Sequence, residues 1–125
     1  MKKQEKEYIK WIHKMYEKYK AVLFIEKYHL KTKKIENGYL ASEFNYPYLD
    51  IEIQYTQEAI NTWLKDKKDH ERRMIHEFCH TITDPFYNVA IECSTRQQIE
   101  HERERLTDHV AQIVNKHFKL IKYGL

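Results

Sequence analysis

The pattern His-Glu-x-x-His, formed by His76, Glu77 and His80, places three side chains of recognisable chemistry within five residues. On an α-helix, residues four apart lie on one face, so His76 and His80 can both point at a single metal ion. Glu77 follows the first histidine, where a carboxylate can take a proton from a metal-bound water. The spacing predicts a zinc site with Glu77 as general base. Two histidines on one helix face can also be ordinary core or surface residues, and the rest of the chain bears on that choice.

The residues around the motif predict a helix that is buried on one side. Apolar side chains recur at helical spacing beside the histidines: Met74, Ile75, Phe78, Cys79 and Ile82. Asp66 or Asp69 can cap the start of this helix, and Asp84-Pro85 predicts that it ends near Thr83. Cys79 lies on the apolar side, which favours a small buried residue over a metal ligand.

Length and composition predict one globular domain over residues 1–125. The chain has 125 residues, of which 33% are charged and 42% hydrophobic, with two Gly and two Pro. A net charge of +3, with acids interleaved among the bases, gives no reason to expect a nucleic-acid partner. The charged N-terminus precedes no apolar signal core, and no apolar run approaches the roughly 20 residues that span a bilayer. We therefore expect a cytoplasmic protein with no membrane partner; its oligomeric state is open.

A helical pattern, then strand-like patterns, then helical patterns follow one another along the chain. The predicted elements are a helix over 4–19, strands over 31–35, 39–44 and 48–55, a short helix over 57–65, the motif helix, and a long helix over 95–119. Asn37-Gly38 predicts a tight hairpin, and Asn45-Tyr46-Pro47 a second turn. The clearest strand is 48–55, whose inward face holds Leu49, Ile51, Ile53 and Tyr55. These patterns predict a small antiparallel sheet of about three strands.

The last helix offers a third zinc ligand. Glu104 is the preferred candidate because Asp108 lies four residues further on the same face, where it can accept a hydrogen bond from a ligating histidine. Glu102 is the next choice, and Glu100 and His101 are remote ones. This face lies away from the apolar stripe expected to be buried: Ile99, Leu106, Val110, Ile113 and Val114. Ala111 continues the Glu104 face and permits close approach. A charged, solvated face is the alternative for this segment.

These residues resemble a known family pattern. His-Glu-x-x-His at 76–80, followed 24 positions later by Glu104-x-x-x-Asp108, resembles the gluzincin branch of the zinc metallopeptidases. The chain also resembles minimal zincins of the kind often encoded by phages and mobile elements. The resemblance lies in its short length and in the sequence Asp84-Pro85-Phe86-Tyr87 before the Glu104 segment. The resemblance covers roughly residues 48–114.

The resemblance implies a zincin-like α+β fold with an N-terminal helix, a small sheet, the motif helix and a C-terminal helix carrying the third ligand. It implies His76, His80 and Glu104 as Zn²⁺ ligands, Glu77 as general base and Asp108 as the partner of a ligand. It also implies that the strand before the motif helix is an edge to which an extended peptide pairs, through Leu49, Ile51 and Ile53. Arg73 departs from the family pattern, and 125 residues are not expected to form the second domain that makes the far wall of a deep cleft. Candidates for stabilising the oxyanion are His101, His109 and Tyr87.

The function predicted from these observations is hydrolysis of peptide bonds by a zinc-bound water that Glu77 activates, with a peptide or protein as substrate. The alternative is a catalytically inactive protein of zincin fold that binds metal or a partner. A small DNA-associated regulator has only the slight positive charge and a helical C-terminus in its favour.

Overall fold

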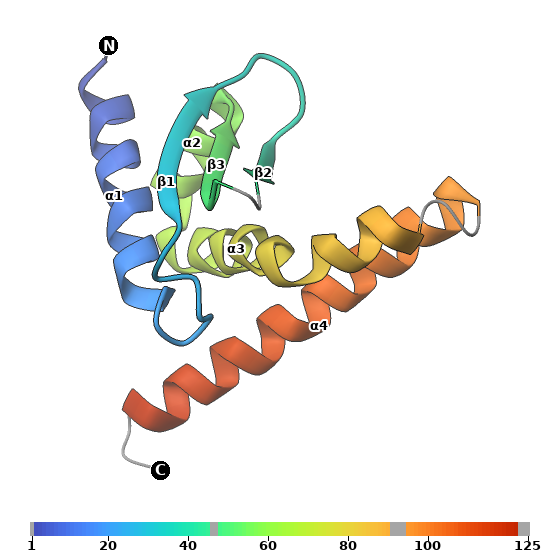
Figure 1. Cartoon of the computed structure of the whole chain (residues 1–125). Helices are drawn as coiled ribbons and strands as arrows, with labels where there is room; N and C mark the ends of the chain where they lie inside the picture. Colours follow the sequence, from blue (N-terminus) through green and yellow to red (C-terminus); the bar gives the residue numbers. More distant parts are fainter. Residues whose placement is uncertain (1, 46–47, 91–94, 123–125) are drawn as a thin grey trace.

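One helix and three strands precede three further helices in the chain (Figure 1). The computed structural model describes residues 2–45, 48–90 and 95–122. Within these residues the elements are, in order, α1 (Lys3–Tyr19), β1 (His29–Lys34), β2 (Leu40–Asn45), β3 (Asp50–Tyr55), α2 (Gln57–Lys65), α3 (Lys67–Ala90) and α4 (Arg96–Lys122). The α+β class predicted from the sequence is confirmed. The predicted turn at Asn45-Tyr46-Pro47 lies partly outside the described residues. None of the described helices is long and apolar enough to cross a membrane.

The sheet is mixed, which corrects the antiparallel sheet predicted from the sequence. Its strand order is β1-β3-β2, with β3 parallel to β1 and antiparallel to β2. The predicted hairpin at Asn37-Gly38 is therefore wrong, because β1 and β2 are not neighbours and β3 is inserted between them. Gly38, at a φ of 92°, still supplies the left-handed conformation needed within the longer connection between them.

The central position of β3 also overturns its predicted role as a peptide-binding edge. Both of its sides are paired, so no backbone groups along its length are left for a substrate strand. Ile51 and Ile53 are buried at 1% and 0% exposure, and Leu49 is half-buried in the turn before the strand. Ile51 and Ile53 therefore belong to the core rather than to an exposed strand edge.

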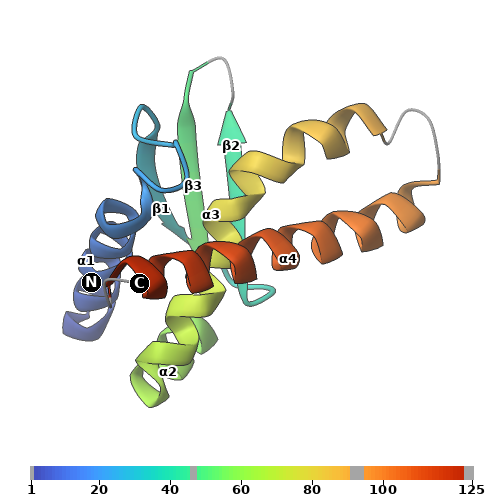
Figure 2. The same cartoon turned by 90° about the horizontal axis from the view of Figure 1, so that it is seen from below.

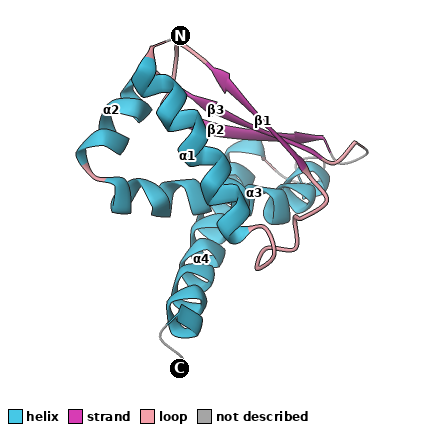
Figure 3. Ribbon diagram, turned by 90° about the vertical axis from the view of Figure 1, so that its left-hand side faces the viewer, coloured by secondary structure: helices cyan, strands magenta, loops and turns pink. Residues whose placement is uncertain are grey.

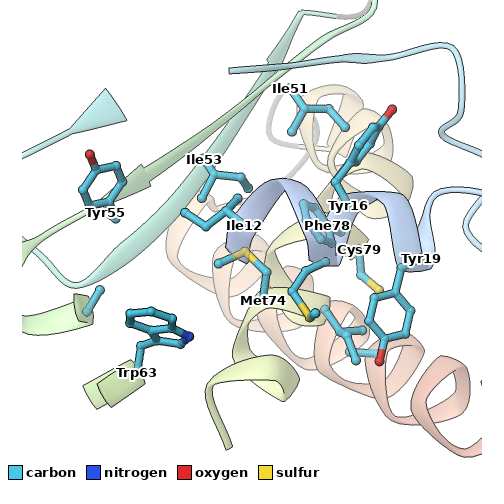
Figure 4. Close-up of a cluster of buried hydrophobic side chains, with 14 of the residues drawn as sticks. Ile12, Tyr16, Tyr19, Ile51, Ile53, Tyr55, Trp63, Met74, Phe78 and Cys79 are labelled. Carbon is cyan, nitrogen blue, oxygen red and sulfur yellow. The ribbon is translucent and has the colours of Figure 1, made fainter. Parts of the chain in front are cut away.

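The core lies between one face of the sheet and helices α1, α2 and α3. Ile51, Ile53 and Tyr55 alternate along β3, so they point to the same face, where they join buried residues of these helices. Figure 4 shows Ile12 of α1 and Phe78 of α3 among them. Figure 3 shows α1 and α2 on the same side of the strands, at their left in this view. α3 is thereby anchored through Met74, Ile75, Phe78 and Cys79, all at 0% or 1% exposure, and its motif residues are fixed relative to the sheet.

α3 begins as the sequence predicted and ends later. Asp66 caps it by accepting a hydrogen bond from the backbone N–H of Asp69 at 3.1 Å. The predicted end at Asp84-Pro85 is wrong, because the helix continues through Pro85 to Ala90. Proline removes one backbone donor, whose partner would be the carbonyl of Thr81, and here the packing of α3 along α4 outweighs that loss.

α4 runs back alongside α3, as Figure 2 shows from below. Its buried face matches the predicted apolar stripe only in part: Val110 and Val114 pack against the core, but Leu106 and Ile113 are 47% and 55% exposed, whereas Thr107 and Ala111 are buried. The small side chains of Thr107 and Ala111 let the two helix backbones approach closely. α4 therefore turns the face that also carries Glu104 and Asp108 toward α3, which resolves the apparent conflict between the apolar stripe and the ligand face.

Candidate metal centre

The imidazoles of His76 and His80 project from successive turns of α3 toward the carboxylate of Glu104 on α4. Nε2 of His76 lies 3.0 Å from one carboxylate oxygen, and Nε2 of His80 lies 3.4 Å from the other. One ligand atom from each residue lies within 4.8 Å of the other two. Ligand atoms about 2.1 Å from a tetrahedral zinc ion are roughly 3.4 Å apart. The donor set and its spacing therefore fit a zinc ion.

The remaining nitrogen of each histidine is held by a second carboxylate. Nδ1 of His76 lies 3.0 Å from Asp108, and Nδ1 of His80 lies 2.9 Å from Asp84. When Nδ1–H donates to a carboxylate, the lone pair of the neutral ring resides on Nε2, the atom that faces Glu104. Both histidines are thus oriented as metal ligands usually are in proteins.

Asp84 belongs to the candidate centre, which its place in a helix-ending Asp-Pro pair does not predict. Its side chain is 13% exposed, and its carboxylate lies 2.9 Å from Nδ1 of His80. The signal was present in the spacing, since Asp84 follows His80 by four residues and shares its helix face. Recognising it required knowing that α3 continues past Pro85.

The electrostatics around His80 are dominated by carboxylates. Burial disfavours the charged imidazole, but the hydrogen bond and charge of Asp84, together with Glu77 and Glu104, outweigh burial and raise the pKa of His80 above its ordinary value. The same negative surroundings attract a divalent cation between the two imidazoles. The arrangement therefore suits a cation, either a proton or a metal.

Glu77 is buried beside the ligand set, with 8% exposure. Burial raises the pKa of its carboxyl group above the ordinary range, against the opposing effect of His80 and His76. Its main-chain carbonyl accepts a 3.1 Å hydrogen bond from Ser42 Oγ, which ties β2 to α3 at the motif. Glu77 and His76 also line a common cavity.

The close contact of α3 with α4 is what brings Glu104 to the histidines. Thr83 and Thr107 share a buried hydrogen bond of 2.6 Å, three residues after His80 on one helix and three after Glu104 on the other. Ala111 is 7% exposed one turn further along α4. A bulkier residue at either small position would separate the helices and draw Glu104 away from the imidazoles.

The other sequence candidates lie elsewhere. Glu102 pairs with Arg105 at 3.1 Å, and Glu100 pairs with Arg96 at 3.1 Å, so neither faces the histidines. Of the oxyanion candidates, Tyr87 donates its hydroxyl hydrogen to Glu100 at 2.9 Å, and His101 and His109 are exposed on α4. The structure brings none of these three to Glu104.

A second residue missed from the sequence is Arg103. Its guanidinium lies between two carboxylates of the centre, with Nε 3.5 Å from Asp84 and Nη2 3.4 Å from Glu104. Its central carbon also lies 4.2 Å from the centre of the Tyr87 ring. Arg103 therefore offsets part of the negative charge of the centre and restrains two of its carboxylates.

Comparison of the chain with protein-family models, curated proteins and solved structures gave no match. The likeness to minimal zincins, the origin in a phage or mobile element and the cytoplasmic location therefore stay predictions.

Proposed function

We propose that this chain is a zinc-dependent hydrolase of peptide bonds. The observation that carries the proposal is the convergence of the Nε2 atoms of His76 and His80 on Glu104, with Nδ1 of each ring held by an aspartate. Two oriented imidazoles and a carboxylate are the ligands of one class of catalytic zinc site, which leaves a coordination position open. Glu77 beside them supplies a carboxylate that is not part of the ligand set.

A zinc ion held by His76, His80 and Glu104 would supply Lewis acidity and favour ionisation of water. Glu77 accepts the proton that water loses as its oxygen attacks the peptide carbonyl carbon. When the C–N bond breaks, Glu77 returns this proton to the leaving amine. Asp84 and Asp108 hold the two imidazoles in one orientation throughout.

The strand available to a peptide is β2 rather than β3. β2 pairs with β3 on one side, and its other side pairs with no strand within the described residues. Ser42 places this strand beside the main chain of Glu77. An extended substrate that adds to β2 would run past the candidate centre, with main-chain hydrogen bonds that depend little on its sequence.

The test compares wild type with Glu77→Gln, which preserves the shape of the side chain and removes its basicity. Elemental analysis is expected to find about one zinc per chain in both proteins. Turnover of a mixture of fluorescence-quenched peptides is expected only with wild type, with a loss of at least about 10²-fold in the variant. Equal turnover by the two proteins, with zinc present in both, would refute the role of Glu77.

A second candidate function is metal or partner binding without turnover. It is favoured by one observation: the nearby groups able to stabilise an oxyanion already have partners, Tyr87 in Glu100 and Arg103 in Asp84 and Glu104. In that case Glu77→Gln changes no measurable activity, and removing zinc with a chelator lowers the melting temperature of both proteins equally. The two candidates are separated by the wild-type peptide assay.

A further inference from the structure

A cavity of about 450 Å³ adjoins the candidate centre. It is enclosed by α3, by α4 and by the start of β2, and both His76 and Glu77 line it. A group bound in this cavity would therefore lie next to the ligand set and the proposed base. The chemistry of its far end bears on which substrates the centre accepts.

The far end of the cavity is cationic. Arg72 and Arg73 line it and precede His76 and Glu77 by four residues each, so they lie one helical turn back on the same face of α3. Their side chains are 67% and 55% exposed. The carboxylate that faces both of them is Asp69, which leaves this end of the cavity with an excess of one positive charge.

Both guanidinium groups are hydrogen-bonded to Asp69 and retain N–H donors for a ligand. Asp69 accepts one hydrogen bond from each arginine, at 3.2 Å from Nε of Arg73. A guanidinium carries five N–H donors, so these contacts use only a small part of the set. The central carbon of Arg73 lies 5.4 Å from the centre of the Tyr39 ring, which restrains that side chain further.

One helical turn from the two arginines, the cavity is lined by carboxylates. Glu77 and Asp108 line it there, and both carboxylates belong to the candidate centre. A ligand with a carboxylate group is therefore repelled at one end and attracted at the other. This polarity fixes the direction in which such a group enters, with the carboxylate toward the two arginines.

We propose that the cavity binds a carboxylate of the substrate, and that Arg72 and Arg73 select peptides carrying one within about two residues of the cleaved bond. The inference rests on the proposed function. The separation between the recognised carboxylate and the cleaved bond follows from geometry. The arginines lie one helical turn, about 5.4 Å, from the centre, and an extended peptide advances about 3.3 Å per residue. The carboxylate is either an Asp or Glu side chain or the C-terminal carboxylate, and planar guanidinium groups pair well with either.

The experiment measures binding separately from turnover. Zinc-loaded Glu77→Gln protein is titrated with fluorescein-labelled peptides that differ at one position, Glu in one and Gln in the other, each made with a free and an amidated C-terminus. Fluorescence anisotropy is expected to show about tenfold tighter binding of the Glu peptides if a side chain is recognised. If the terminal carboxylate is recognised instead, the peptides with a free C-terminus are expected to bind about tenfold more tightly than the amidated ones.

Variants of the cavity test the residues that carry the preference. The double substitution Arg72→Gln, Arg73→Gln is expected to remove the preference for a carboxylate. Its matched control, Arg96→Gln with Arg105→Gln, removes the same charge from arginines that do not line this cavity and is expected to retain the preference. Asp69→Asn is expected to raise the preference for a carboxylate about threefold, because it frees both guanidinium groups from their own carboxylate. Circular dichroism confirms that each variant is folded.

The outcomes separate this inference from the proposed function. Equal binding of all four peptides, while wild type cleaves them, overturns the inference and leaves the hydrolase proposal standing. Failure of every peptide to bind also overturns the inference, and wild-type turnover then decides the proposed function independently. Loss of the preference in the control double variant as well as in the cavity variant would assign it to overall charge rather than to Arg72 and Arg73.

Discussion

α3 holds histidines in two environments that differ in their hydrogen-bond partners. His70, near the start of the helix, is 1% exposed, with Nε2 2.7 Å from the hydroxyl of Tyr8 and Nδ1 3.2 Å from that of Tyr39. His80, further along the helix, faces carboxylates on both nitrogens. Burial, aided by the charge of Arg73, lowers the pKa of His70 to about 4, whereas the carboxylates raise the pKa of His80. The two rings are buried to a similar degree and respond oppositely to protons.

The difference indicates what distinguishes a structural histidine from a candidate metal ligand. In the His70 cluster both ring nitrogens are paired with neutral hydroxyls. One nitrogen of the neutral ring donates its hydrogen and the other accepts one, so no lone pair is left for a cation. In the centre only Nδ1 has a structural role, and Nε2 points at a carboxylate that a metal ion could share. A cation is excluded from the first environment and stabilised in the second. Burial alone does not distinguish them.

The largest expected effect is on zinc content, which should differ between substitutions in the two environments. His80→Ala removes one of three ligands and is expected to abolish zinc binding, because two remaining ligands hold the ion weakly. His70→Gln is expected to keep about one zinc per chain, since Gln also offers a donor and an acceptor to the two tyrosines. Elemental analysis after gel filtration measures both. Zinc retained by His80→Ala, or lost from His70→Gln, would erase the distinction.

The next effect is on folding stability, where the order is reversed: the substitution of His70 is expected to matter more than that of a candidate ligand. His70→Ala leaves the Tyr8 hydroxyl without its partner and opens a cavity in the core, and is expected to lower the free energy of unfolding by about 2–4 kcal/mol. His76→Ala removes a half-buried ring and is expected to cost less than about 1 kcal/mol when a chelator keeps both proteins free of metal. Urea denaturation provides the comparison. Equal destabilisation by the two substitutions would mean that His76 also has a core role.

The residues of the centre were largely predictable from the sequence because they are tied to local spacing. His76, Glu77 and His80 follow from the helical period, and Glu104 with Asp108 from a second pair four residues apart. Asp84 was not predicted because its contact with His80 needs α3 to continue past Pro85, and Arg103 because its role depends on how α3 and α4 pack. The sequence shows that Leu106 is apolar, but not that the small side chains of Thr107 and Ala111 form the contact.

The topology of the sheet was less predictable, for a physical reason. Alternation along residues 50–55 shows that one face of the strand is buried, but it does not state which strands flank it. Asn37-Gly38 favours a tight turn locally, and the pairing of both β1 and β2 with β3 overrides that preference. Pro85 teaches the same lesson, because one lost backbone hydrogen bond is outweighed by contacts along the whole helix pair.

A smaller effect tests whether the carboxylate partners matter within the centre. Asp84→Asn keeps the shape of the side chain but weakens its hold on Nδ1 of His80, and is expected to reduce zinc affinity by about 10–100-fold. Asp108→Asn is expected to have a weaker effect, because Asp108 is 65% exposed and Asp84 only 13%, so water screens Asp108 more. Competition with a chromophoric chelator measures both affinities. An Asp108 effect larger than that of Asp84 would reverse this ranking.

The smallest effect is the part of the pH dependence of stability that the His70 cluster contributes. Because the pKa of His70 is about 4 in the folded chain and about 6.5 in the unfolded one, protons bind the unfolded chain more readily between these values. The stabilisation is therefore fully present above pH 6.5 and is lost as the pH falls toward 4, by about 1–2 kcal/mol at pH 5. Urea denaturation of metal-free wild type and His70→Gln at pH 7 and pH 5 isolates this contribution, since the other carboxylates and histidines titrate in both proteins. Wild type is expected to lose more stability than the variant between the two pH values. An equal loss would show that His70 accepts a proton inside the fold, and that the two histidine environments of α3 differ less in charge than in geometry.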